Sequence, residues 1–315
     1  MKVLLFTHQQ DIDGIGCVVL AQQSFSDLEI VPCKTFEITS KVKEYIENGR
    51  IQEFDSIFVT DLCIKEPLLY DISKNPILAK KLKVIDHHKS EIDEGNDSYD
   101  FVSITVEKNG RKESGTSLFY QYLLENHFLK ATHYLDTFVE WTRQYDVWDW
   151  QKEKNEKARY LHILFEELGY EKYLEIANSF IQKKEVIFEE ESMNVIHHFE
   201  EKLHQEIQSI LSQMKLVEVT IQKVTYKIGY VTCEYKYRND INEVVKNHNS
   251  NNIDTVGMIM TDMDTVSYRN VKDIDASIIA SYFGGKGHKN AASNPQNNSL
   301  FIDTMKKNHI TLPNT

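Results

Sequence analysis

Three short apolar runs, each followed directly by acidic or imidazole side chains, constrain the fold of this chain more than any other feature. The runs and the residues that follow them are 3–7 with His8, Asp11 and Asp13, 57–60 with Asp61, and 82–85 with Asp86, His87 and His88. Continuous apolar runs of this length are typical of buried parallel strands when helical segments alternate with them. Because open parallel sheets bind ligands at the carboxyl ends of their strands, we expect these polar side chains to lie at one edge.

Acidic side chains gathered at one edge predict a bound cation, because crowded carboxylates repel one another unless a positive ion lies among them. Asp11 and Asp13 precede a predicted helix, so they are also candidates for helix caps. Together with His8 they offer ligands that suit Mn or Mg better than a thiolate zinc site does. Asp146 is the best candidate for a further carboxylate, although the dense aromatic stretch around it also fits a buried tryptophan with a capping acid.

The alternation of predicted strands and helices gives the fold class of the first half. Predicted strands occupy 2–7, 29–34, 57–60, 82–85 and 101–106, and predicted helices occupy 12–25, 40–48, 67–74, 118–129 and 131–144. Strand and helix in repeated succession predict an α/β domain with a doubly wound, mainly parallel sheet. Thr116 is the predicted N-cap of the helix at 118–129.

The second half predicts a smaller α/β domain with a mixed sheet. Residues 171–213 are helical in period and heavily charged, as at Lys183, Lys184 and Glu185, which indicates a solvated connecting helix. We therefore expect a first domain at 1–182, a helical linker at 183–214 and a second domain at 215–315. The runs 216–224, 227–235 and 254–261 alternate apolar and polar residues, which predicts a sheet with one open face.

A glycine-rich stretch near the end of the chain predicts an anion-binding loop. A helix predicted at 273–282 leads into Gly284, Gly285, Lys286, Gly287 and His288, followed by Ala291 and Ala292. Glycine lets backbone N–H groups approach a ligand closely, and the lysine and histidine add donors. With a further helix predicted to start at the two alanines, the stretch is typical of phosphate capture.

Composition narrows the function classes. The chain has 315 residues, 41% of them apolar, and a net charge of −12. Proteins that track long DNA or RNA carry a basic excess, so we expect a small anionic substrate and no long duplex. The four scattered cysteines are predicted to be reduced and buried; they are Cys17, Cys33, Cys63 and Cys233. The first apolar run is too short for a signal peptide or a membrane span, so we expect a cytoplasmic protein without membrane contact.

Taken in order, these motifs resemble the DHH phosphoesterase family with its DHH-associated C-terminal domain. The motifs are His8 with Asp11 and Asp13, then Asp61, then Asp86-His87-His88, then Asp146, then 284–288 with Ala291-Ala292. The resemblance covers nearly the whole chain. Its compact two-domain layout is similar to the oligoribonuclease (nanoRNase) branch, and Tyr145, Asp146 and Trp148 are similar to the NrnB type. Two departures are a shorter spacing between His8 and Asp11, and Lys286 within the glycine run.

The resemblance implies two divalent metal ions, Mn with Mg or Co as alternatives. It implies that one ion is bound by His8, Asp11 and Asp61, and the other by Asp13, Asp61, His87 and Asp146. Asp86, His87 and His88 are the implied catalytic residues, with Asp86 orienting an imidazole and His88 facing the scissile phosphate. The residues implied to bind substrate from the second domain are Arg269, Gly285, Gly287 and His288.

The reaction that the resemblance implies is hydrolysis of a phosphodiester by a metal-activated water. We expect the substrates to be short RNA oligonucleotides or dinucleotides, cleaved to mononucleotides by a monomer or a homodimer. Alternatives with the same site are a 3'-phosphoadenosine phosphatase, a linear or cyclic dinucleotide phosphodiesterase, and an exonuclease on longer single strands. A nucleotide-binding regulator with a degenerate site is disfavoured, because acidic residues seldom cluster so completely without a function.

Overall fold

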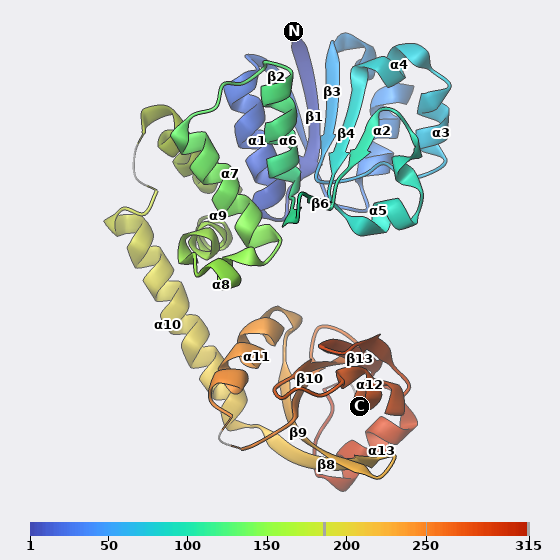
Figure 1. Cartoon of the computed structure of the whole chain (residues 1–315), viewed down its shortest axis with the longest axis vertical. Helices are drawn as coiled ribbons and strands as arrows, with labels where there is room; N and C mark the ends of the chain where they lie inside the picture. The colour runs from blue at the N-terminus through green and yellow to red at the C-terminus, as the bar shows by residue number, and fades with distance from the viewer. Residues whose placement is uncertain (185–186, 250, 314–315) are drawn as a thin grey trace. The chain divides into compact units, whose positions relative to one another are not determined.

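The chain divides into two units, Met1–Phe199 and Glu200–Thr315, and the division falls within helix α10 (Glu190–Ser212). The computed structural model describes residues 1–184, 187–249 and 251–313 (Figure 1). Each unit is built on its own sheet, the first parallel and the second mixed. The predicted fold class is therefore confirmed, whereas the predicted domain limits at 182, 183–214 and 215 stay a prediction.

The sheet of the first unit has the strand order β2-β1-β3-β4-β5, and every neighbouring pair is parallel. Its strands are β1 (Lys2–His8), β2 (Asp27–Cys33), β3 (Ser56–Thr60), β4 (Leu82–Asp86) and β5 (Val102–Ile104). A separate hairpin is formed by β6 (Glu107–Lys108) and β7 (Arg111–Lys112). Since β1, β3 and β4 are adjacent and parallel, the residues that follow them meet at one edge.

Helices cover both faces of this sheet (Figure 1). One face packs against α1 (Ile12–Ser24), α6 (Gly115–Glu125), α7 (His133–Asp146) and α9 (Glu156–Lys183). The other face packs against α2 (Ile38–Glu47), α3 (Leu68–Ser73) and α4 (Pro76–Lys81). Short helices α5 (Lys89–Asp93) and α8 (Asp149–Glu153) and the 3-10 turns η1 (Arg50–Glu53) and η2 (Asn96–Ser98) complete the unit. Burial on both faces explains the continuous apolar runs.

Two details of the predicted helices were wrong. The N-cap of α6 is Ser114, whose hydroxyl accepts the backbone N–H of Ser117, and not Thr116. Residues 171–213 form parts of two helices, because α9 ends at Lys183 and Lys184 adopts a left-handed backbone with φ of 61°. Glu185, which the sequence placed within the connecting helix, lies outside the described residues.

The second unit holds a six-stranded sheet in the order β12-β13-β11-β10-β9-β8, in which only β9 and β10 are parallel neighbours. Its strands are β8 (Lys215–Ile221), β9 (Val224–Cys233), β10 (Thr255–Met260), β11 (Thr265–Asn270), β12 (Lys286–His288) and β13 (Ala291–Pro295). Its helices are η3 (Tyr235–Tyr237), α11 (Arg238–Asn247), α12 (Ala276–Tyr282) and α13 (Ser299–Lys307).

The prediction of one open sheet face is confirmed at the edge strand β8, where exposed and buried residues alternate, and is wrong at the central strand β10. All six residues of β10 are buried, because one apolar cluster packs on each side of the strand. The first cluster includes Ile279 of α12 and Phe301 of α13, and the second includes Ile241 of α11 and Ile207 of α10. The alternation at 254–261 therefore does not mark a solvent-facing side.

The prediction of a helix at Ala291 and Ala292 was also wrong, because these residues begin strand β13. The preceding glycines are required by the sheet. A Cβ on Gly285 would lie 2.0 Å from the carbonyl oxygen of Ser293, and one on Gly287 would lie 2.3 Å from the Cα of Ala292. Close packing of β12 on β13 thus explains the glycine run, and the loop does not open into a helix N-terminus.

Two predictions from composition can be compared with the structure. Cys17, Cys33, Cys63 and Cys233 are all free and buried, as predicted. Among the described residues, every helix is too short or too polar to cross a membrane.

Arg143 of α7 is the largest fully buried charged side chain among the described residues, and it joins three segments of the first unit. Its guanidinium donates to Glu140 (2.7 Å), to Asp149 (2.8 Å) and to the carbonyl oxygen of Lys112 (3.0 Å). Loss of the arginine would leave the half-buried Asp149 carboxylate and the Lys112 carbonyl oxygen without this donor and would leave Glu140 with Arg111 alone.

We therefore expect Arg143→Met to lower the free energy of unfolding of the first unit by about 3 kcal/mol. Urea denaturation followed by tryptophan fluorescence measures this, because all three tryptophans of the chain lie in the first unit. The matched control is Lys172→Met, which removes an exposed pair with Glu175 and should change little. Equal midpoints for the two variants would contradict a structural role for Arg143.

Candidate metal centre

The carboxyl edge of the parallel sheet gathers the acidic and imidazole side chains. His8 is the last residue of β1, Asp86 is the last residue of β4, and Asp61 directly follows β3. Asp61 has a left-handed backbone with φ of 57°, which aspartate tolerates better than most residues. Its N–H donates to the carbonyl oxygen of Ile85 at 3.0 Å, so the neighbouring strand holds this turn in place.

His8, Asp11 and Asp61 form the first part of the cluster. The Nδ1 atom of His8 lies 2.8 Å from a carboxylate oxygen of Asp11 and 3.7 Å from one of Asp61. Asp11 is also the N-cap of α1, since its other oxygen accepts the N–H of Gly14 at 3.1 Å. Asp11 can therefore cap the helix with one carboxylate oxygen while the other oxygen is available as a metal ligand.

Asp13 is fixed by the N-terminus of helix α6, which lies about a hundred residues away in the sequence. The N–H groups of Gly115 and Thr116 donate to its two carboxylate oxygens at 2.6 and 2.9 Å. The hydroxyl of Thr116 donates to the Asp13 carbonyl oxygen at 2.5 Å. The N-terminus of α6 therefore fixes both carboxylate oxygens of Asp13 in position at the strand edge.

His87 connects the remaining carboxylates. Its Nε2 atom lies 3.3 Å from Asp61, 3.6 Å from Asp146 and 3.7 Å from Asp13. Asp146, the last residue of α7, thus reaches the strand edge from the helical layer. The structure brings together all six residues predicted to be metal ligands, in two groups that meet at Asp61.

Asp86 and His88 form a separate pair at the rim of the cluster. One oxygen of buried Asp86 accepts the backbone N–H of His87 at 2.7 Å and lies 2.8 Å from Nδ1 of His88. His88 is 51% exposed, and its ring lies beside that of His87, with 4.3 Å between the centroids. Asp86 thus orients the exposed imidazole, which leaves the second ring nitrogen of His88 available to a ligand.

The electrostatics of the cluster reflect its excess of buried acid. Burial and the charges of Asp13 and Asp11 raise the pKa of Asp61 well above its usual range. Burial and Asp13 raise the pKa of Asp146 in the same way. Although burial opposes it, the adjoining carboxylates of Asp11 and Asp61 raise the pKa of His8 to about 10. Each shift has the direction that a missing positive charge produces.

The donor set fits divalent cations. Three groups of side chains each place their ligand atoms within 4.8 Å of one another; these groups are His8 with Asp11 and Asp61, Asp13 with His87 and Asp146, and Asp61 with Asp86, His87 and His88. Within the described residues, Oδ2 of Asp61, Nε2 of His87 and Oδ2 of Asp146 are buried without a hydrogen-bond partner. Buried polar atoms are normally paired, so these atoms call for an ion. Carboxylate and imidazole ligands suit Mn or Mg.

The second unit presents two of the other predicted residues, Arg269 and His288, on one face of its sheet. Arg269 of β11 and His288 of β12 both pair with Ala291 of the intervening strand β13. Residues directly opposite in neighbouring strands point to the same face, so the arginine and the histidine lie two strands, or roughly 10 Å, apart on one face. The exposed segment 286–289 continues this row.

Two residues near Arg269 were missed by the sequence analysis. Burial and the charge of the Arg238 guanidinium lower the pKa of Arg269, so the two cations lie near one another. Arg238 also covers the ring of Tyr235 at 3.7 Å. Within the described part of the chain, the hydrogen bonds of both arginines go to Ser267 Oγ or to backbone carbonyl oxygens, and neither forms an ion pair with an acid. Paired guanidinium groups of this kind are suited to an anion.

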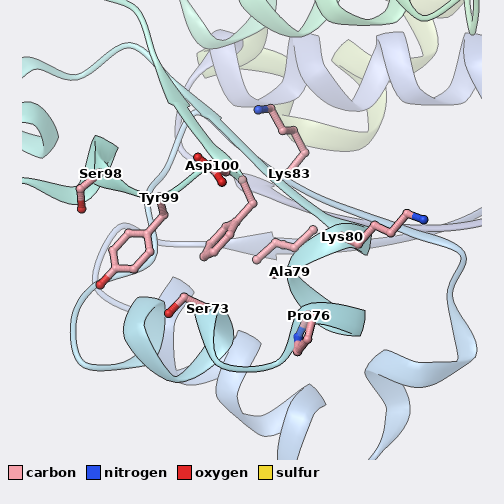
Figure 2. Close-up of a pocket in the computed structure, with 10 residues that line it drawn as sticks. Ser73, Pro76, Ala79, Lys80, Lys83, Ser98, Tyr99 and Asp100 are labelled. Carbon is pink, nitrogen blue, oxygen red and sulfur yellow. The ribbon is translucent and has the colours of Figure 1, made fainter.

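A concavity of about 590 Å³ in the first unit lies away from the acidic cluster (Figure 2). Its wall includes Leu82 and Lys83 at the start of β4, and Tyr99, Asp100 and Phe101 just before β5. These are the amino ends of the strands, opposite the edge where ligands bind to open parallel sheets. The concavity is therefore not assigned to the candidate metal centre.

Close packing at Gly115 gives a test of the scaffold around the acids. A Cβ on this residue would lie 2.6 Å from the Cβ and 2.9 Å from the Cα of Asp61. We expect Gly115→Ala to weaken Mn²⁺ binding roughly tenfold or more, because misplaced supporting contacts reduce metal affinity. Titration calorimetry measures the affinity, with Lys130→Ala as a control because that side chain is exposed and lies outside the acidic cluster. Unchanged Mn²⁺ affinity in a folded Gly115→Ala protein would contradict this role.

Comparison with known proteins identifies the family. No protein-family model matches the sequence. Oligoribonuclease NrnB of Bacillus subtilis (strain 168) is 30% identical over 296 residues, which cover 91% of this chain and 71% of that protein. Two solved structures share the fold. Exonuclease RecJ bound to manganese has a TM-score of 0.54 at 13% identity, covering 97% of this chain and 88% of that chain. The pGpG-specific phosphodiesterase PggH of Vibrio cholerae has a TM-score of 0.51 at 10% identity, covering 98% of this chain and 97% of that chain.

The likeness to RecJ and PggH concerns the fold alone, whereas the relation to NrnB extends over most of both sequences. The ordered motifs of the resemblance lie at the carboxyl edge of the first sheet and on the second sheet. The chain belongs to the DHH phosphoesterase family, in the group that contains oligoribonuclease NrnB.

Proposed function

We propose that this protein is a metal-dependent phosphodiesterase that hydrolyses short oligonucleotides, including dinucleotides, to mononucleotides. The observation that carries the proposal is the buried cluster of aspartates and histidines whose unpaired atoms fit divalent cations. The 30% identity to an oligoribonuclease supports RNA as the substrate class. Manganese is the first candidate ion because it accompanies RecJ, which has the same fold, and Mg or Co are alternatives.

The proposed ligands divide into two groups that share Asp61. His8 and Asp11 would hold one ion with Asp61, and the second ion would be held by Asp13, Asp61, His87 and Asp146. When bound, two divalent ions neutralise developing charge on phosphate oxygens and make water a nucleophile near neutral pH. The N–H groups at the α6 N-terminus would hold the Asp13 carboxylate in place for this task.

His88 is proposed to contact the scissile phosphate. Its hydrogen bond with Asp86 raises the pKa of the His88 imidazole, so the protonated form is favoured. With Nδ1 occupied by Asp86, Nε2–H is the donor that remains for a phosphate oxygen. A protonated donor stabilises the charge that develops on phosphate during hydrolysis.

The second unit is proposed to bind another part of the substrate. Arg269 and Arg238 would bind a phosphate, and Tyr235 and His288 offer further contacts. Gly287 is proposed to contribute its backbone N–H beside this row. The N–H of Gly285 donates to the carbonyl oxygen of Ala280 at 2.8 Å, so a substrate contact at Gly285 would not use that group. The net charge of −12 disfavours long polyanions, because repulsion grows with each added phosphate outside the local cationic patch.

A substrate survey tests the proposed function. Purified protein with Mn²⁺ is incubated with labelled RNA and DNA of two to twenty-four nucleotides, with pGpG, a cyclic dinucleotide and 3'-phosphoadenosine 5'-phosphate. We expect rapid conversion of the shortest RNAs to mononucleotides and slow cleavage of the longest. Turnover of phosphoadenosine phosphate alone would replace the proposal with a phosphatase.

Asp61→Asn tests the shared ligand, because asparagine keeps the shape and tolerates the left-handed backbone but removes the charge. We expect turnover of a dinucleotide to fall roughly a thousandfold, with loss of bound metal. In a chelator the variant should melt above the wild type, because one buried repulsive charge is gone. Asp97→Ala, an exposed aspartate outside the cluster, is the control. Full metal content and full turnover in Asp61→Asn would remove the shared-ligand assignment.

Arg269→Ala and His288→Ala test the second unit. We expect each to lower kcat/KM for a dinucleotide, by roughly thirtyfold for the arginine, because one charge-assisted contact contributes about 2 kcal/mol. Hydrolysis of a small aryl phosphodiester, which lacks the remote contacts, should hardly change. Lys246→Ala on α11 is the matched cationic control. Equal losses on both substrates, in variants that circular dichroism shows to be folded, would contradict substrate binding by this unit.

A further inference from the structure

An aromatic cluster surrounds the end of helix α7, directly after the candidate ligand Asp146. The ring of Tyr145 lies flat against His162 of α9, with 4.4 Å between centroids and 17° between planes. The ring centroid of Trp148 lies 5.9 Å from that of Tyr145 and 5.8 Å from that of Trp150. The four rings thus form one connected group that the proposed mechanism does not use.

Trp148 is the exposed member of this group. It is 42% exposed, although tryptophan is among the side chains that gain most from burial. Its φ of 65° lies in the left-handed region, where a bulky residue is strained and where glycine or asparagine would be easier to accommodate. Strained residues persist mainly at ligand sites, so neither packing nor backbone conformation accounts for a tryptophan at this position.

Two polar atoms of the cluster are buried without a hydrogen-bond partner among the residues that the structure describes. They are Nε1 of Trp150 and Nδ1 of His162. Burial lowers the pKa of His162 to about 4, so this imidazole is neutral at physiological pH. A neutral imidazole stacked on a tyrosine is suited to a flat, uncharged ring system more than to a phosphate.

The cluster adjoins the acidic residues on two sides. Trp148 follows Asp146 by two positions, and Asp146 lies 3.6 Å from His87. On the other side, the charge of Asp11 acts on the His162 imidazole, so the two side chains are near one another. A nucleotide whose phosphate is at the metal ligands has its base within the reach of this group, since both belong to the same unit.

On these grounds, and resting on the proposed function, we propose that Trp148 stacks on a nucleobase of the oligonucleotide next to the scissile phosphate. Tyr145, Trp150 and His162 would fix the tryptophan from behind. Every base has an aromatic face, so stacking positions the substrate without selecting a sequence. Trp148 would therefore be a positioning residue for short oligonucleotides in general.

Dinucleotides that lack one base provide the test. The wild type should cleave a full dinucleotide roughly tenfold more efficiently than the analogue that is abasic at the stacked position. Trp148→Ala should lose that preference and cleave both substrates equally, whereas Trp148→Phe should keep most of it. Tyr70→Ala, which removes another exposed aromatic side chain of the first unit, should keep it fully. A preference that persists in Trp148→Ala, for abasic sites at either position, would overturn the proposal.

Intrinsic fluorescence gives a second measurement that does not depend on catalysis. Adenosine monophosphate should quench the tryptophan emission of the wild type strongly and that of Trp148→Phe much less. Of the two remaining tryptophans, Trp141 packs against Phe180 and Phe188, and Trp150 lies behind position 148, so neither would stack on the base. Equal quenching of the two proteins would contradict stacking on Trp148. A wild type that is quenched but cleaves no dinucleotide would reject the proposed function while retaining the base site.

Discussion

Repulsion among buried carboxylates at the carboxyl edge of the first sheet is the constraint on which the rest of this structure depends. Asp13, Asp61 and Asp86 are each at most 2% exposed, and Asp11 and Asp146 adjoin them. Such a group is stable only if the scaffold fixes each acid and a cation offsets the charge. Three features of the scaffold fix these acids: the ends of the buried strands, the left-handed turn at Asp61 and the N-terminus of α6. The site is therefore held by buried elements of the fold.

The strand ends could be predicted from sequence because the signal is local. A buried parallel strand is a continuous apolar run, and its carboxyl end must meet those of its neighbours. For this reason His8, Asp61 and Asp86 could be expected to lie together. Asp146 was a weaker case, because its position depends on where α7 crosses the sheet edge.

Other features could not be predicted because they depend on contacts between distant segments. The sequence predicts Thr116 as a cap, yet Thr116 binds Asp13, and no local sequence pattern near either residue predicts that contact. The sequence also predicts a phosphate loop at Gly285 and Gly287, because glycine permits both close approach to a ligand and close approach to another strand. Only the position of β13 shows that these glycines allow close approach to another strand. Arg238 near Arg269 likewise follows from the placement of α11 beside β11, which no local pattern records.

The distribution of charge and aromatic rings bears on the substrate length. A chain with a net charge of −12 has little long-range attraction for nucleic acid, so affinity must come from a few local contacts. The proposed contacts are divalent cations held by the acidic cluster, the guanidinium pair in the second unit, and the rings after Asp146. Each of these would engage a single phosphate or base, so additional nucleotides would add repulsion without adding contacts. An enzyme that degrades short RNA fragments of every sequence needs contacts to phosphates and to the faces of bases, because these contacts do not depend on sequence. The binding energy of the contacts away from the scissile bond is then used to position the phosphate that is cleaved.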